Sequence, residues 1–380
     1  MTTRRLVQDK MLAMRRLEPS PRIVWLSNET PDREGGGGQR RQYFQIRALL
    51  SAGVDVRVAS LVSTQHHTSL REMVRVERFG PADRRGRFHD PALDRFLSAE
   101  RADGAVVAHV ESVPNVRGAL AKHRLPWLLD FQNVNSRWYL ARGKRHSAVA
   151  WMRRERAALR WAATATACSD EERCALLAVS AGAHVEVVGN GIAPEEWPET
   201  ALQERRRPDI AVASSWTHEP NRDGARWLAR EVWPTIRSAV PEARLLLAGP
   251  GAPPRLALET AGIEHLGRVD DLASLMGSVR VSVVPIVKGI GARVKFGEAL
   301  ASGAAVVSTS TGAEGFDAAG CFVTADDPTS FAGACIDLLR APDRAAALGR
   351  AGREVAFGRY TWEQRCDPLV QWVRESTHSS

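Results

Sequence analysis

Hydrophobic segments along the chain are short, and helix-length stretches of mixed apolar and polar residues separate them. In the first half, the apolar segments cover residues 22–27, 54–61, 105–110, 126–131, 164–168 and 184–188. Their lengths, and stretches such as residues 39–53 between them, predict strands joined by helical crossovers. Crossover connections place neighbouring strands parallel, so this half predicts a mostly parallel α/β sheet.

The same alternation begins again after the charged, proline-containing segment 203–209. The apolar segments of the second half cover residues 209–215, 243–251, 264–268, 280–286, 304–310 and 321–324. The chain therefore predicts two Rossmann-like domains facing each other across a cleft, where ligands commonly bind. We expect an N-terminal tail at 1–20, a first domain at 21–189, a second at 190–358, and a final helix at 359–380 that packs back towards the first.

Composition narrows the class of protein. The chain has 380 residues, of which 44% are hydrophobic and 25% charged, which is ordinary for a globular protein. No apolar segment approaches the ~20 residues that span a bilayer, and residues 1–22 lack the apolar core of a signal peptide. These features predict a cytoplasmic protein. The five cysteines have neither CxxC spacing nor nearby histidines, which favours reduced thiols over a metal site.

The net charge of +8 indicates an anionic partner or the arginine usage of a GC-rich genome. Nucleic acid is not favoured, because no zinc-finger, RRM or basic-zipper pattern accompanies the charge. The basic segment 141–161 contains Trp151 and Trp161 among its arginines. It predicts either peripheral contact with an anionic membrane at the inner face, or, as the favoured reading, core tryptophans beside solvated arginines.

The most informative segment is KGIGARVKFGEALASGAAVVSTSTGAEGF, residues 288–316. Gly289 and Gly291 lie between a predicted strand and a predicted helix, where free backbone N–H groups favour anions. Arg293 and Lys295 in the first turn are unfavourable for the helix itself. They therefore indicate a bound anion; the alternative is a pair of solvated surface cations.

Glu298 follows Lys295 by three residues on the same predicted helix face. It pairs with Lys295 within the helix, or it accepts hydrogen bonds from a diol such as ribose. An anion site beside a diol acceptor describes a nucleotide diphosphate, which is the interpretation we favour.

Segment 291–316 resembles the donor-binding segment of the family-4 retaining glycosyltransferases of GT-B fold. Further segments resemble that family in the same order: the glycine-rich loop and helix at 35–61, ATACSDEERCALLA at 165–178, VVGNGIAPEEW at 187–197, LLLAGPG at 245–251 and HLGRVDDLASLM at 265–276. Together these segments extend over most of the chain.

The resemblance implies a metal-independent, cofactor-free hexosyltransferase. Such an enzyme moves a sugar, with retention, from a nucleotide-diphosphate sugar to a hydroxyl of a small-molecule, lipid-linked or glycan acceptor. It assigns catalysis to Arg293, Lys295 and His109, and a weak acceptor contact to Asn133; a purely structural role is the alternative for His109, a single histidine at the end of a predicted strand. The donor-binding residues are Gly36, Gly37, Gly38, Gly249, Val269, Gly289, Ile290, Gly291, Ala292, Glu298 and Glu314.

The sequence departs from the family pattern at two places. Ile290 stands where family members commonly carry a glutamate, eight residues before the position of Glu298. SSWTHEPNRDG, residues 214–224, replaces the usual basic residues after the first strand of the second domain. Both departures resemble a subgroup in which an Arg-x-Lys pair, here Arg293 and Lys295, leads the donor helix.

Other functions fit less well. A nicotinamide dehydrogenase needs GxGxxG directly after the first strand, but residues 28–34 intervene here. No Asp-x-Asp occurs, and the acid pairs at 270–271 and 326–327 are expected to cap helices instead. A phosphorylase needs a far longer chain. A nucleotide-sugar epimerase and a non-catalytic nucleotide-sugar-binding partner protein stay open; the glutamate missing at Ile290 motivates the second.

Overall fold

The computed structural model describes residues 20–60, 70, 73–74, 76–78, 91–202 and 207–378. The expected tail therefore lies outside the described residues except for Ser20, as does much of the charged segment 203–209. The chain forms two compact units. The N-terminal unit comprises the described residues up to Asp130, residues 158–165 and the C-terminal segment from Pro368; the C-terminal unit comprises residues 131–157 and 166–367.

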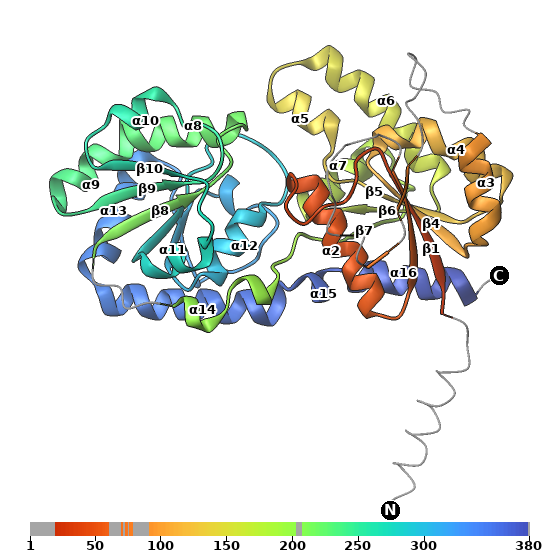
Figure 1. Ribbon diagram of the computed structural model, residues 1–380. Coiled ribbons are helices and arrows are strands. Elements are labelled where there is room, and N and C mark those ends of the chain that lie inside the picture. The colour runs from red at the N-terminus through yellow and green to blue at the C-terminus, as the bar shows by residue number, and fades with distance from the viewer. Residues whose placement is uncertain are drawn as a thin grey trace, which may run out of the picture. The chain divides into compact units, whose positions relative to one another are not determined.

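The first sheet has the strand order β3-β2-β1-β4-β5-β6-β7 (Figure 1). Its strands are β1 (Arg22–Ser27), β2 (Asp55–Ser60), β3 (Val76–Arg78), β4 (Gly104–Ala108), β5 (Trp127–Asp130), β6 (Thr164–Ala167) and β7 (Val185–Val187). The pairs β1–β2, β1–β4, β2–β3 and β4–β5 are parallel. Every strand predicted for this half is confirmed, and β3 is additional.

The central strands of the first sheet are buried. All five residues of β4 and the last five of β1 are inaccessible to solvent or nearly so, as expected for a parallel sheet covered on both faces. Chain order reverses between β1 and β4, so the loops after these two strands leave the sheet in opposite directions.

Helices connect the strands of this first half. They are α2 (Gly37–Ser51), α3 (Pro91–Glu100), α4 (Val113–Lys122), α5 (Asn135–Ala141), α6 (Arg145–Trp161) and α7 (Asp170–Val179), with a 3-10 turn, η2 (Val110–Ser112), before α4. Gly53, with a φ of 83°, follows α2 and ends it as expected. The C-terminal helix α16 (Asp367–His378) contacts the first sheet inside the N-terminal unit, because Trp372 lies against Gly104 of β4.

The second sheet has the order β10-β9-β8-β11-β12-β13 (Figure 1). Its strands are β8 (Asp209–Ala213), β9 (Arg244–Ala248), β10 (Ile263–Gly267), β11 (Val281–Val284), β12 (Ala305–Ser308) and β13 (Val323–Thr324). All five neighbouring pairs are parallel, and every predicted strand is confirmed. The order reverses between β8 and β11, the same pattern as in the first sheet.

Helices of the second half pack on both faces of this sheet, where two separate buried clusters lie. The helices are α8 (Glu219–Trp227), α9 (Trp233–Ala239), α10 (Arg255–Glu259), α11 (Leu272–Ser278), α12 (Val294–Ala301), α13 (Pro328–Arg340), α14 (Pro342–Arg359) and α15 (Trp362–Arg365). A π-helical turn, η5 (Leu228–Val232), joins α8 to α9. Short 3-10 turns are η3 (Pro194–Glu196), η4 (Glu199–Ala201) and η6 (Thr311–Ala313). Asp271 and Asp327 cap α11 and α13, as predicted.

Candidate functional site

The candidate site lies at the carboxyl ends of β8 and β11, where the strand order of the second sheet reverses. Loops after such strands diverge and leave a crevice in which open α/β sheets bind ligands. Ser214 and α8 follow β8, and the glycine loop 289–292 and α12 follow β11. Every side chain of this site belongs to the C-terminal unit.

The glycine loop requires glycine at two positions. Gly289 has a φ of 141° and Gly291 a φ of 87°, which side-chain-bearing residues rarely adopt. A Cβ at Gly289 would also collide with the Arg293 guanidinium. A Cβ at Gly291 would lie 3.3 Å from Asn133 Oδ1 and 3.5 Å from Glu172 Oε1. The loop backbone is therefore held close to polar side chains.

Arg293 is the N-cap of α12, so the prediction that it lies in the first turn is corrected by one position. Its Nε and Nη2 atoms are buried and have no hydrogen-bond partner in the described part of the chain. Burial lowers the pKa of Arg293, although the Glu314 carboxylate nearby opposes this shift. Leaving buried guanidinium donors without an acceptor is costly, so an arriving anion would lower that cost.

Lys295 lies in the first turn of α12 and is partly buried. Its Nζ donates to Ser214 Oγ at 3.1 Å and to Asn221 Oδ1. Burial, and then the neighbouring Arg293 charge, lower the pKa of Lys295 to about 7, against the pull of Glu298. Two adjacent cations thus share a poorly solvated position, which a phosphate charge would stabilise.

Ser214 and Asn221 were not predicted as site residues. Asn221 donates from Nδ2 to the Ser215 carbonyl at 2.6 Å, so its Oδ1 is turned towards Lys295. Both residues lie in segment 214–224, which departs from the family pattern. The unusual composition of this segment could have drawn attention to Ser214 and Asn221. Their role is visible only once the structure places them beside Lys295.

Glu314 connects the glycine loop to a second arginine. Its Oε1 accepts from the Gly291 N–H at 3.1 Å and from Arg137 of α5. The Glu314 side chain is only 8% exposed, so this carboxylate is held inside the site. Arg137 was missed by sequence reasoning, because it lies 177 residues from its partner.

The other predicted donor-binding residues lie around the same strand ends. Ala292 accepts from Asn190 Nδ2 at 3.0 Å through its carbonyl, and Ile290 is buried. Gly249 follows β9 with a φ of 127°, and a Cβ there would collide with the Ser214 carbonyl. Val269 follows β10 and is half-buried. Glu298 lies on α12 close enough to Lys295 to act on its pKa.

Asn133 approaches Gly291, together with a buried acid that the sequence did not single out. Glu172 of α7 accepts from Cys168 Sγ at 3.2 Å and from the Val134 N–H at 3.4 Å. Burial raises the pKa of Glu172 to about 7. This acid lies beside the glycine loop, and with a pKa of about 7 it is about half ionised in neutral solution.

The predicted residues Gly36, Gly37, Gly38 and His109 belong to the N-terminal unit. Gly36 is the N-cap of α2, which begins at Gly37 and not at residue 39 as predicted. His109 follows β4, which ends at Ala108, so it lies just beyond the strand in which it was predicted. Gly36 ends the loop after β1, Gly37 and Gly38 begin α2, and His109 follows β4, where the first sheet reverses its order.

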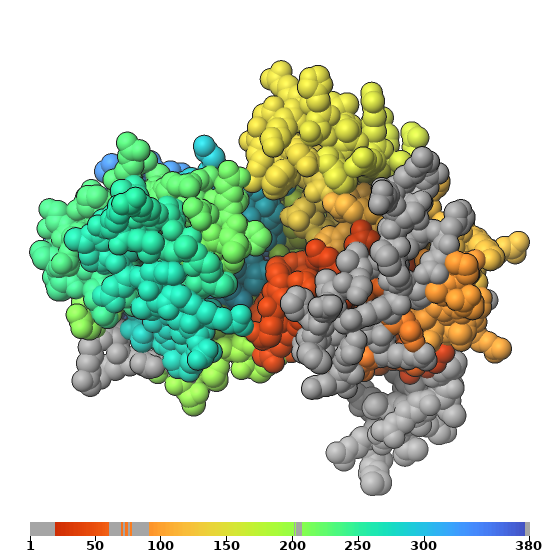
Figure 2. Space-filling model, turned by 45° about the horizontal axis from the view of Figure 1, so that its top comes forward, coloured from red at the N-terminus to blue at the C-terminus, as the bar shows by residue number. Residues whose placement is uncertain are grey.

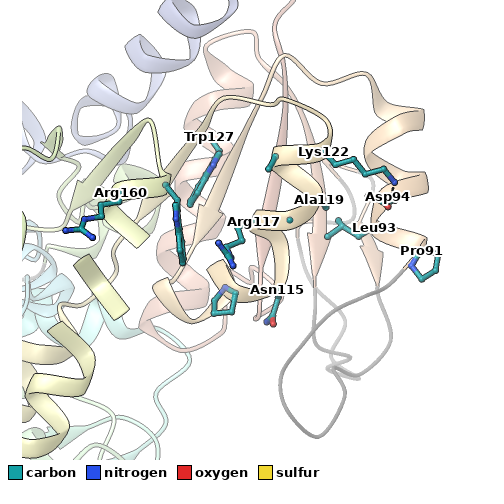
Figure 3. A pocket seen from close by; sticks show the side chains of 13 residues that line it. Pro91, Leu93, Asp94, Asn115, Arg117, Ala119, Lys122, Trp127 and Arg160 are labelled. Atoms are coloured by element: carbon teal, nitrogen blue, oxygen red, sulfur yellow. Dashed lines mark hydrogen bonds and ion pairs between the residues drawn. The ribbon is translucent and has the colours of Figure 1, made fainter. Parts of the chain in front are cut away.

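A hollow of about 840 Å³ in the N-terminal unit contains none of the predicted site residues (Figure 3). Residues of α4 line it, together with residues of α3 and with Trp127 and Arg160. The Arg117 guanidinium lies 4.0 Å from the ring centroid of Trp161, so one face of that indole is already covered.

The basic segment 141–161 differs from the favoured prediction of core tryptophans. Figure 2 shows α5 and α6 (yellow) at the surface. Trp161 is 46% exposed and Trp151 is half-buried. The one acid of α6, Glu155, is buried and accepts from the Ser136 N–H at 2.9 Å. The exposed face therefore carries cations without an exposed acid of the same helix: Lys144 just before α6, and Arg145, Arg153, Arg154 and Arg156.

Two features are absent from the described residues. These residues contain no group of three or more histidine, cysteine or acidic side chains arranged to hold a metal ion. Among the same residues, no helix is both long and apolar enough to cross a bilayer.

Residues 207–341 match the family described as "Glycosyl transferases group 1". This match contains β8, β9, β11, α12 and Glu314, and thus most of the candidate site. No curated protein matches the sequence significantly.

Solved glycosyltransferase structures share the fold over nearly the whole chain. Sucrose-phosphate synthase from Thermosynechococcus elongatus is 17% identical with a TM-score of 0.73, covering 94% of this chain and 100% of that one. Anabaena HepE in complex with UDP-glucose is 14% identical with a TM-score of 0.68, covering 94% and 100%. WaaG, a glycosyltransferase involved in lipopolysaccharide biosynthesis, is 13% identical with a TM-score of 0.62, covering 92% and 99%. The predicted fold class, α/β of GT-B type with two Rossmann-like sheets, is confirmed.

Proposed function

We propose that this protein is a retaining glycosyltransferase that moves a hexose from a nucleotide-diphosphate sugar to a hydroxyl of an acceptor. The observation that carries the proposal is the partly buried cation pair at the switch point of the second sheet. Two Arg293 donors have no partner among the described residues and Lys295 has a depressed pKa, and both stand at the start of α12 beside a glycine loop. An anion would stabilise such a position, and the free N–H groups of a helix start bind phosphate.

The chemistry follows from where charge develops. When the bond between the anomeric carbon and the diphosphate oxygen breaks, negative charge gathers on the leaving diphosphate. Arg293, Lys295 and the N–H groups of the loop stabilise that charge, and a single preorganised contact of this kind contributes ~3 kcal/mol. The acceptor oxygen bonds to the anomeric carbon on the vacated face, and its proton passes to a departing phosphate oxygen. No carboxylate nucleophile of the glycosidase type is required.

Glu298 would hold the ribose diol of the nucleotide, and Gly249 and Val269 would contact the nucleoside. A hexosyl donor is favoured because Anabaena HepE, of similar fold, was solved with UDP-glucose. We propose that the reaction needs no metal, since two cations and the helix start supply the positive charge that a metal would otherwise provide. Residues 207–341 match a glycosyltransferase family, which supports the reaction class.

The test is a thermal-shift screen against nucleoside diphosphates and nucleotide sugars, followed by turnover assays with EDTA present. A ligand at 100 times its Kd adds ~2.7 kcal/mol of stability. We expect one nucleoside diphosphate to raise the melting temperature, and the matching nucleotide sugar to be consumed only when an acceptor hydroxyl is added. No shift with any nucleotide would contradict the donor site.

The same assays distinguish the alternatives. An epimerase converts the nucleotide sugar without an acceptor. A non-catalytic nucleotide-sugar-binding partner binds the donor tightly but leaves it intact when the single chain is purified. Ile290, in place of the usual glutamate, is the observation that keeps the second alternative open.

A further inference from the structure

The loop after β4 contains a histidine with an unusual backbone. His109 has a φ of 68° and a ψ of 134°, a conformation rare outside glycine. Its N–H donates to the Asp130 carbonyl at 3.1 Å, at the end of the neighbouring strand. Strained conformations of this kind persist where the surrounding structure imposes them, and they gather at functional sites. His109 lies at the switch point of the first sheet, as Arg293 and Lys295 lie at that of the second.

A chain of hydrogen bonds that begins in the core determines which nitrogen of the His109 ring accepts a hydrogen bond. Trp25 Nε1, which can only donate, bonds to Gln42 Oε1 of α2 at 3.0 Å in a buried position. The Gln42 amide is thereby oriented, and its Nε2 lies 3.2 Å from His109 Nε2. An amide NH2 group can only donate, so His109 Nε2 must accept. The ring proton of the neutral imidazole is then on Nδ1.

One nearby group opposes this arrangement. Glu29 Oε2 lies 3.7 Å from the same His109 Nε2, and a carboxylate favours a proton there. Glu29 is half-exposed, whereas Gln42 is fully buried. The buried ion pair of Arg41 with Asp130 holds α2 against the end of β5, with 2.7 Å between Nη2 and Oδ1. The position of Gln42 is therefore fixed by the core, while that of Glu29 is not.

We propose that Gln42 is a positioning residue that holds His109 in its neutral Nδ1–H tautomer. Resting on the proposed function, the inference is that Nδ1 donates a hydrogen bond to substrate. The ring cannot then act as the base that takes the acceptor proton, because one nitrogen accepts from Gln42 and the other already carries hydrogen. His109 thus orients and polarises substrate, and the acceptor proton leaves by another route.

The tautomer can be measured directly by nitrogen NMR of the full chain labelled at histidine, in alkaline buffer. The His109→Asn variant identifies the signals of His109. We expect the protonated nitrogen to be Nδ1 in the native protein. Gln42→Glu keeps an acceptor for Trp25 but presents a carboxylate to the ring, so we expect the proton to move to Nε2. A native Nε2–H tautomer, or no change in Gln42→Glu, overturns the proposal whether or not the protein has transferase activity.

Kinetics with a matched pair of variants tests whether His109 acts as a hydrogen-bond donor to substrate. Asparagine and aspartate both tolerate positive φ better than other side chains, so His109→Asn and His109→Asp should fold alike. The asparagine amide can donate from nearly the position of Nδ1, whereas aspartate can only accept. We expect kcat/KM to fall by less than about tenfold in His109→Asn and by about 10²-fold or more in His109→Asp. If both variants fold and lose kcat/KM equally, His109 is not a hydrogen-bond donor to substrate.

Discussion

At the residue scale, Arg293 and Lys295 are cations whose neighbours do not neutralise them completely. Lys295 is held by the neutral oxygens of Ser214 and Asn221, and two Arg293 nitrogens are without hydrogen-bond partners in the described part of the chain. A site that tolerates this cost gains when a phosphate supplies the missing charge. Their removal is therefore expected to affect donor use more than folding.

We predict that Arg293→Ala and Lys295→Ala each lower kcat/KM by about 10²-fold or more. Neither variant should melt at a lower temperature, because each removes a poorly solvated charge. Lys288→Ala is the matched control, since Lys288 is an exposed cation directly before the glycine loop. Steady-state kinetics and thermal melting measure both effects. Native turnover in both site variants would contradict the phosphate assignment.

The depressed pKa of Lys295 predicts proton uptake on donor binding. In the free site Lys295 loses its proton at about pH 7, and an arriving diphosphate raises its pKa towards the ordinary value of about 10.4. Between these values the bound state holds more protons than the free state. Donor affinity should therefore be fully present below pH 7 and fall as the pH rises through the pKa of the free site.

Calorimetry at about pH 8.5, in buffers of different ionisation heat, measures that uptake. A phosphate with a second pKa near 6 is already ionised at this pH, so it does not contribute. We expect close to one proton per donor bound in the native protein and none in Lys295→Met. Equal uptake in the two proteins would show that another group takes the proton.

The sequence predicted the cations of the site because they stand at an unfavourable place in a helix. It did not predict Arg137, Ser214 or Asn221, whose roles depend on partners 74 to 177 residues away. No local pattern marks a serine as the partner of a lysine in another βα loop. Glu172 was not predicted either, because its burial depends on how α7 packs.

At the element scale, the glycine loop before α12 sets the geometry of the site. Gly291→Ala would force a side chain into a φ of 87°, against Asn133 and Glu172. We predict that this variant loses donor affinity by about tenfold or more, since the loop must shift and its N–H groups with it. Titration with the nucleoside diphosphate measures the loss.

Gly320→Ala is the matched control for that experiment. Gly320 has a similar φ of 81°, but open space surrounds it. Both variants should lose comparable stability from backbone strain, and only Gly291→Ala should lose donor affinity. Equal affinities would show that the loop is not part of the donor site.

The basic face of α6 allows a second prediction at this scale. Its cations are exposed, its one acid is buried, and Val149 beside them is 46% exposed. We predict that the protein sediments with vesicles containing anionic lipid but not with neutral vesicles, and that high salt releases it. Arg145→Glu combined with Arg153→Glu should abolish binding. Arg344→Glu with Arg350→Glu on α14 is the control of equal charge, and if it reduces binding as much, the effect is one of net charge.

Most elements could be predicted, because buried parallel strands are continuous apolar segments, whereas the helices between them mix apolar and polar residues. The three residues of β3 (Val76–Arg78) were missed, since so short a strand has no periodicity. The π-helical turn η5 was missed as well, because the residues of 228–232 favour an ordinary helix. Helix starts shifted by one or two residues where glycine is part of the turn, as at α2 and α12.

At the scale of the whole molecule, the two sheets repeat one topology without a repeated sequence. The strand order reverses between β1 and β4 in one sheet and between β8 and β11 in the other, and each switch point carries a glycine-containing loop and candidate site residues. Alternation of strands and helices predicted the parallel sheets, but strand order follows from how the crossovers pack. The glycines and cations of the sequence therefore pointed to the candidate site, and the topology explains why these residues meet.

The last prediction concerns where a bound nucleotide protects the chain from hydrogen exchange. Because Ser214, Arg293, Lys295 and Glu314 belong to one unit, a nucleoside diphosphate should slow exchange in peptides covering residues 210–221, 285–299 and 309–316. Peptides of the N-terminal hollow, residues 91–100 and 113–122, serve as the control and should be unchanged. The full nucleotide sugar tests separately whether residues 35–42 and 109–112 also become protected, as expected if Gly36–Gly38 and His109 contact the donor. Protection confined to the hollow would place the nucleotide there and contradict the donor site, since a bound ligand slows exchange most where it suppresses local opening.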